Sequence, residues 1–131
     1  MNEATKIKER MRALAVGIVR LSQELPRNHT GWTLGNQILR SGTSVGANYR
    51  AACRARSRRE FIAKLGIVEE EADETLFWLD ILKESGLVTE DRVEALRREA
   101  NQLLAITVAS IRTARMARRA NPQSAIRNPQ F

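Results

Sequence analysis

Apolar and small residues recur in alternating steps of four and three along four segments of the chain. The first segment carries Ile7, Met11, Leu14, Ile18 and Leu21 in this spacing. Such a spacing marks the buried face of an α-helix that packs in a bundle. A proline would interrupt a helix of this kind, and all three prolines lie outside the four segments. The pattern therefore predicts long helices and an all-α fold.

Four amphipathic helices joined by three short connections predict an antiparallel up-down-up-down four-helix bundle. We expect the helices at about 3–24, 31–56, 58–85 and 89–118. The bundle would then occupy residues 1–118. The remaining residues, 119–131, contain two prolines and no acidic residue, and they predict a disordered basic C-terminal tail.

Capping residues set three of these boundaries. Thr30 is the expected N-cap of the second helix. Ser57 is followed three residues later by Glu60, which is the spacing of a capping box at the start of the third helix. Gly86 follows the last periodic residues of that helix and predicts its end.

Charge is distributed unevenly along the chain. The net charge is +7, from 22 Lys and Arg against 15 Asp and Glu. Residues 1–60 contain 12 basic and 4 acidic residues, whereas residues 61–111 contain 5 basic and 11 acidic residues. Residues 112–131 contain 5 basic residues and no acidic residue. This distribution suits either binding of a polyanion or contact between the basic part of one subunit and the acidic part of another.

Arginines concentrate around the turn between the second and third helices. The five in this cluster are Arg50, Arg54, Arg56, Arg58 and Arg59. In the predicted topology this turn shares one end of the bundle with the end of the fourth helix. The arginines there are Arg112, Arg115, Arg118 and Arg119. Together the two groups predict a surface that binds nucleic-acid phosphates. The alternatives are a solvated turn, or arginines that pair with carboxylates of a neighbouring helix or subunit.

Other features indicate a subunit interface. Two glycines four residues apart share a helix face and predict the close approach of another helix. The apolar arc of the third helix is broader than one bundle seam requires. An acidic block in that helix lies within reach of an arginine of the second helix, inside the chain or across subunits. The predicted interface residues are Arg40, Gly42, Gly46, Glu70, Glu71, Glu74 and Trp78.

Nothing in the sequence indicates an enzyme. It shows no nucleophile–base pair, no glycine-rich phosphate loop and no cluster of metal ligands. His29 is the only histidine and Cys53 the only cysteine, so we expect no metal, no cofactor and no internal disulfide. Without a membrane span or a signal-peptide core, a cytoplasmic location is expected.

Several motifs carry a resemblance to a known family. They are Leu25 with Pro26, QILRSGTSVGAN at 37–48, SRREF at 57–61 and LKESGLV at 82–88. Over about residues 21–111 the chain resembles the four-helix bundle protein family, also named for proteins encoded in intervening sequences of bacterial 23S rRNA genes. It is similar as well to the accessory variability proteins of diversity-generating retroelements. After Asn48 it departs from the commoner family pattern and reads YRAACRAR, an arginine-richer stretch.

The resemblance implies a helical bundle that assembles as a ring-like homopentamer. For the retroelement relatives it implies binding to nucleic acid and to a reverse transcriptase, and it supplies no catalytic residues. Taken with the charge pattern, it leads us to expect a non-enzymatic, oligomeric protein that binds nucleic acid, RNA in the first place, by backbone or shape recognition. The alternative is a protein-interaction scaffold whose arginines pair with acidic residues of the third helix across subunits.

Overall fold

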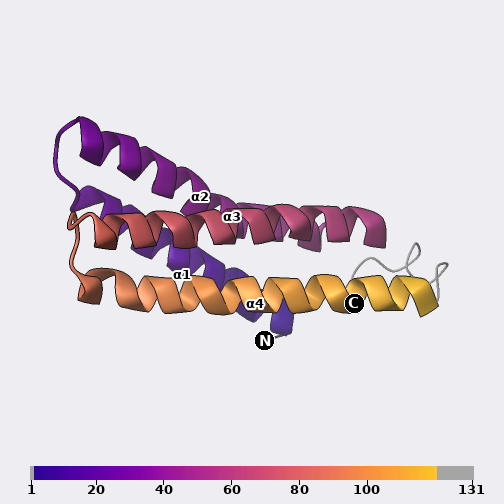
Figure 1. Ribbon diagram of the computed structural model, residues 1–131. Helices are drawn as coiled ribbons and strands as arrows, with labels where there is room; N and C mark the ends of the chain where they lie inside the picture. The colour runs from indigo at the N-terminus through magenta and orange to yellow at the C-terminus, as the bar shows by residue number, and fades with distance from the viewer. Residues whose placement is uncertain (1, 121–131) are drawn as a thin grey trace.

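The computed structural model describes residues 2–120, apart from the side chains of residues 118–120, and these residues form four helices. The helices are α1 (Glu3–Gln23), α2 (His29–Cys53), α3 (Arg58–Glu84) and α4 (Glu90–Ala120). Successive helices run in opposite directions, so the α1–α2 and α3–α4 connections lie at one end and the α2–α3 connection at the other (Figure 1). The predicted antiparallel four-helix bundle is confirmed.

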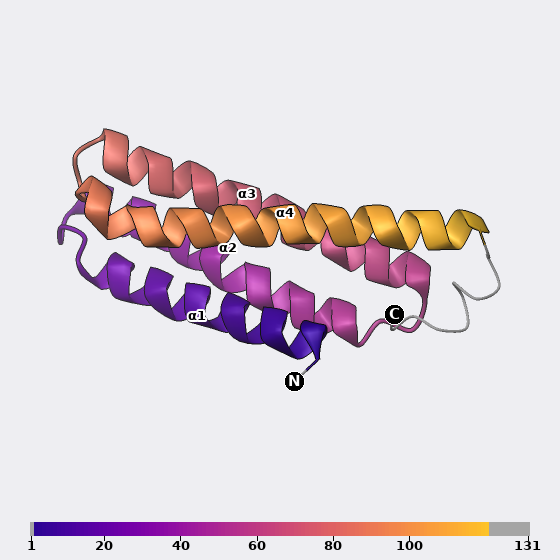
Figure 2. The ribbon, with the colours of Figure 1, turned by 90° about the horizontal axis from the view of Figure 1, so that it is seen from below.

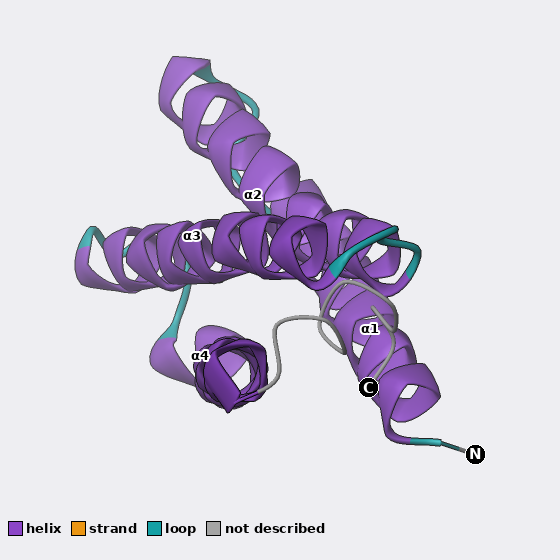
Figure 3. Cartoon of the chain, turned by 90° about the vertical axis from the view of Figure 1, so that its right-hand side faces the viewer, coloured by secondary structure: helices purple, strands orange, loops and turns teal. Residues whose placement is uncertain are grey.

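The helices pack in chain order, with α1 on α2, α2 on α3 and α3 on α4, whereas α1 and α4 make the smallest contact. Figure 3 looks along α4 and shows the other three helices inclined to it. Figure 2 shows that α4 continues past the beginnings of α1 and α3. The last turns of α4 therefore project beyond the part of the bundle in which four helices meet.

The predicted apolar faces form the core. Met11, Ile18 and Leu21 of α1 are fully buried, as are Leu65 and Leu79 of α3. Ile38 and Val45 of α2 and Leu103 of α4 join them in one hydrophobic cluster. The steps of four and three thus identify the inward face of each helix.

Two of the three predicted caps are present. Ser57 Oγ accepts a hydrogen bond from the Glu60 backbone N–H at 3.1 Å, and α3 begins at the next residue. Gly86 has a φ of 79°, which only glycine adopts readily. The Leu87 N–H donates to the Leu82 carbonyl at 3.1 Å, the hydrogen bond that ends a helix in a Schellman motif.

The third predicted cap is wrong. Asn28, not Thr30, caps α2, because its Oδ1 accepts from the Gly31 N–H at 2.9 Å and the helix begins at His29. Asparagine is at least as good an N-cap as threonine. Gly31 is buried, and a Cβ there would overlap the Pro26 carbonyl oxygen. The loop is therefore closed by one cap and one glycine.

At the carboxyl end, α4 continues through Ala120, two residues past the predicted end of the bundle. The rest of the predicted tail, residues 121–131, lies outside the described residues.

Candidate nucleic-acid interface

Helices α1 and α2 approach closely because α2 carries small residues on the face turned to α1. A Cβ added to Gly42 would lie 2.9 Å from Ile18 Cγ1, and one added to Gly46 would lie 3.2 Å from Met11 Cβ. The close approach predicted for these glycines is confirmed, but the partner is α1 of the same chain. Their assignment to a subunit interface stays a prediction.

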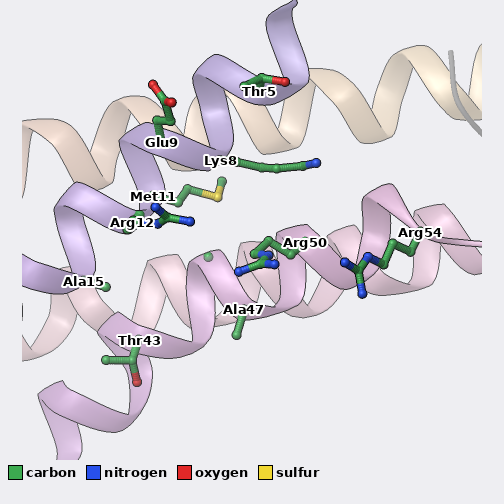
Figure 4. A pocket seen from close by; sticks show the side chains of 11 residues that line it. Thr5, Lys8, Glu9, Met11, Arg12, Ala15, Thr43, Ala47, Arg50 and Arg54 are labelled. Carbon is green, nitrogen blue, oxygen red and sulfur yellow. The ribbon is translucent and has the colours of Figure 1, made fainter.

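A groove of about 400 Å³ runs between α1 and α2 near the α2–α3 end (Figure 4). Buried Met11 and the small residues Ala15, Gly46 and Ala47 form apolar parts of its lining. The remaining lining residues are Thr5, Lys8, Glu9, Arg12, Thr43, Arg50 and Arg54. The groove is therefore bounded by cationic side chains from both helices.

Four cations line this groove. Lys8 and Arg12 come from α1, Arg50 comes from α2, and Arg54 is the C-cap residue that follows α2. None of the four forms an ion pair within the described residues, and Glu9 is the one carboxylate in the lining. The groove therefore has a net charge of about +3, from four cations and one carboxylate, at neutral pH.

Three acidic residues of α3 pair with arginines outside the α1–α2 groove. Arg40 Nη1 lies 2.8 Å from Glu71 Oε2, and Arg40 also pairs with Glu74. Arg97 Nε lies 2.7 Å from Asp80 Oδ1. Among the described residues, no carboxylate of α3 lines the α1–α2 groove.

Trp78 joins the pair between α2 and α3. Its indole Nε1–H donates to Glu74 Oε2 at 3.0 Å. This bond and the Arg40 guanidinium hold the pKa of Glu74 below its usual value, so the carboxylate stays charged. Arg40, Glu71, Glu74 and Trp78, which the sequence assigned to a subunit interface, thus form one cluster within the chain. Glu70 is exposed beside them.

The arginines at the α2–α3 turn differ in exposure. Arg56 and Arg59 are exposed, whereas Arg58 is only 5% exposed. A guanidinium so deeply buried belongs to the packing of the corner, and we leave Arg58 out of the candidate surface.

The arginines of α4 line a second groove. This groove, of about 270 Å³, lies between α3 and α4. Its lining residues are Glu69, Val108, Ile111, Arg112, Arg115 and Met116. The two arginine groups predicted from sequence therefore lie near the same end of the bundle but in separate grooves. The side chains of Arg118 and Arg119 lie outside the described residues.

Sequence reasoning missed Lys8 and Arg12. Both lie off the apolar face of α1 and are four residues apart, so they share a helix face. The signal that places them beside Arg50 is the antiparallel register, in which Met11 meets Gly46. That register cannot be read from α1 alone.

Tyr49 adds no negative charge to this region. It is buried beside Arg50, and burial, followed by its interactions with Cys53, raises the pKa of its hydroxyl far above the usual value. The phenol therefore stays neutral at physiological pH.

Two further features are absent from the described residues. They contain no group of three or more His, Cys, Asp or Glu side chains that could bind a metal ion. No helix among them is long and apolar enough to cross a lipid bilayer.

Comparison with known proteins identifies a matching family and a similar solved structure. The model of the family described as 23S rRNA-intervening sequence protein matches residues 3–109. One similar solved structure is a protein of unknown function from the S23 ribosomal protein family of Bacteroides thetaiotaomicron VPI-5482. Its sequence is 36% identical, the match covers 80% of this chain and 97% of that chain, and the TM-score is 0.76. No curated protein matches.

The family match covers the four-helix region up to the middle of α4 and includes both walls of the α1–α2 groove. It agrees with the resemblance carried by the motifs at 37–48, 57–61 and 82–88. This chain belongs to the 23S rRNA-intervening sequence protein family.

Proposed function

We propose that this protein binds nucleic acid through the phosphate backbone and that the α1–α2 groove is its main contact surface. The observation that carries the proposal is the convergence of Lys8, Arg12, Arg50 and Arg54 on one groove without ion pairs within the described residues. Unpaired cations release condensed counterions from a polyanion when they bind it, which drives association. The family description refers to 23S rRNA, and this supports RNA as the first nucleic acid to test.

The proposed mode is recognition of the backbone rather than of bases. No aromatic side chain lines either groove, so neither offers a surface on which bases can stack. The exposed Arg56 and Arg59 at the α2–α3 turn would add phosphate contacts at the same end, and Arg112 and Arg115 would add others in the second groove. The function is binding without catalysis.

A second candidate function is a protein-interaction scaffold, favoured by apolar side chains left on the surface. Trp32 is 61% exposed and Phe77 53% exposed, and Glu70 is exposed on the same helix as Phe77. In this proposal the chain forms a cytoplasmic homo-oligomer, a pentamer as the resemblance implies. A reverse transcriptase or another protein would then dock on it.

The test is binding of a labelled RNA hairpin and a duplex DNA by fluorescence anisotropy across a range of salt concentrations. The variant is Arg50→Gln/Arg54→Gln. Its control, Arg20→Gln/Arg27→Gln, removes two exposed arginines that line neither groove and form no ion pair in the described residues. Both variants change the net charge equally.

We expect the groove variant to lower the slope of log affinity against log salt by about 1.4 to 1.8, since each lost phosphate contact contributes about 0.7 to 0.9. The control should keep the parent slope. Equal losses in the two variants would mean that only net charge matters, and the groove assignment would fail. No binding even at low salt would favour the scaffold, which sedimentation would then characterise.

A further inference from the structure

If the α1–α2 groove binds nucleic acid, as proposed above, its shape also bears on which form of nucleic acid it accepts. The following inference rests on that proposed function. We infer that the groove takes one strand by its phosphates, with the bases turned outward, so that single strands bind more tightly than duplexes. Four features of the groove lead to this inference: its width, the spacing of its cations, the burial of Lys8 and the small residues of its lining.

The width is set by the contact between α1 and α2. Helices in contact have axes about 8–10 Å apart, and the missing Cβ atoms of Gly42 and Gly46 favour the close end of this range. A duplex, whose major groove alone is about 12 Å wide, is broader than the space between two such helices. Because the helices themselves fill the distance between their axes, the groove is a surface furrow bordered by side chains of α1 and α2. A duplex could rest only on the outer edges of this furrow, whereas the backbone of a single strand is narrow enough to lie along it.

The cation spacing matches one backbone. Arg50 and Arg54 are four residues apart, as are Lys8 and Arg12, so about 6 Å of helix axis separates the members of each pair. Consecutive phosphates of a stretched strand are separated by a similar distance. Because the two pairs face the same groove from opposite helices, successive phosphates of one strand can each meet a cation from either side.

Depth distinguishes Lys8 from the other three cations. Arg12, Arg50 and Arg54 are exposed, whereas Lys8 is half-buried. A duplex on the outer edges would meet the exposed arginines. Only a ligand inside the groove would also meet Lys8, so this residue reports which form of nucleic acid enters.

The small residues that line the groove indicate whether the phosphates or the bases of the strand face inward. Ala15, Gly46 and Ala47 leave room for a narrow backbone but present no flat surface to a base. With the phosphates inside and the bases outside, the groove would not read sequence or the 2′-hydroxyl. Single-stranded RNA and DNA should therefore bind alike.

The experiment compares three labelled probes of equal length with the full chain: an unstructured oligouridine, an oligothymidine and a duplex DNA. We expect both single strands to bind about tenfold more tightly than the duplex and within about threefold of each other. Lys8→Gln should weaken single-strand binding severalfold and leave the duplex nearly unchanged. The matched control is Lys6→Gln, which removes an exposed lysine of the same helix that lines neither groove.

The outcomes separate the two proposals. If none of the probes binds at low salt, the proposed function itself fails. If the duplex binds as tightly as the single strands, or if Lys8→Gln weakens all probes equally, nucleic-acid binding stands and the single-strand inference is overturned. Circular dichroism of each variant checks that the helices are intact.

Discussion

Replacing Gly42 by alanine tests whether this glycine sets the distance between α1 and α2. The added Cβ would lie 2.9 Å from both Ile18 Cγ1 and Ile18 Cγ2 and 3.1 Å from Ile18 Cβ. Ile18 is fully buried, so it has little room to move away. Such overpacking costs about 1–3 kcal/mol. Against this, alanine gains about 1 kcal/mol over glycine in a helix interior.

A matched substitution at another helical glycine separates the cost of the clash from the gain in helix propensity. Gly66 also lies inside a helix, and a Cβ there would meet no atom within 4 Å. Gly66→Ala should therefore stabilise the protein by about 0.5–1 kcal/mol. Since both substitutions gain the same helix propensity, the difference between them isolates the clash with Ile18, about 1–3 kcal/mol.

The assay is urea unfolding followed by far-UV circular dichroism, at one protein concentration because the stability of an oligomer depends on it. A double-mutant cycle adds Ile18→Ala, which alone should cost about 2–5 kcal/mol. In that background Gly42→Ala should become stabilising, with a coupling energy of about 1–3 kcal/mol. If Gly42→Ala has the same effect with and without Ile18, the glycine does not set the contact and the reasoning is refuted.

Two further predictions concern the loop before α2 and the contact between α1 and α4. Gly31→Ala should destabilise the protein by about 1–3 kcal/mol in the same urea assay, because the added Cβ would overlap the carbonyl oxygen of Pro26, a backbone atom that cannot rotate away. A neutral result would show that the loop moves freely. Hydrogen bonding from Arg10, assisted by the charge of its guanidinium, lowers the pKa of Glu99. The ionised carboxylate therefore stabilises the fold at pH values above its unfolded-state pKa of about 4.3, and this stabilisation is lost as the pH falls through the lower folded-state pKa. The stability difference between the parent and Glu99→Gln should therefore shrink as the pH is lowered from 7 to 3, and a constant difference in pH-dependent unfolding would contradict the ion pair.

Most of the fold could be predicted because it depends on local periodicity and caps. Alternating steps of four and three identify the inward faces, and Ser57 and Gly86 identify two helix boundaries where they occur. The error at the start of α2 arose because Asn28 and Thr30 are both good N-caps. The choice between them depends on how Gly31 packs against Pro26, which is a contact between a loop and a helix.

The candidate site was predicted only in part, because it depends on which helix faces which. Clustering along the chain identified Arg50 and Arg54, but adjacency in sequence also included Arg58, which is buried. The contribution of Lys8 and Arg12 arises from the register between α1 and α2, and single-helix patterns do not contain it. For the same reason, the sequence alone did not show that Gly42 and Gly46 contact Ile18 and Met11 of α1.

The same contact joins stability to the proposed binding. Gly42 contacts Ile18 one helical turn away from Gly46, and Gly46 forms part of the groove lining, where an added Cβ would lie 3.2 Å from Met11 Cβ. Any side chain there would push α1 away from α2 and widen the distance between Lys8 and Arg50. The glycines thus accept a loss of helix propensity of about 1 kcal/mol each. In return α1 and α2 pack closely, and cations from both sides line the same groove. The two glycines lower the helix propensity of α2, and the close packing that they allow between α1 and α2 is therefore the physical basis for the groove.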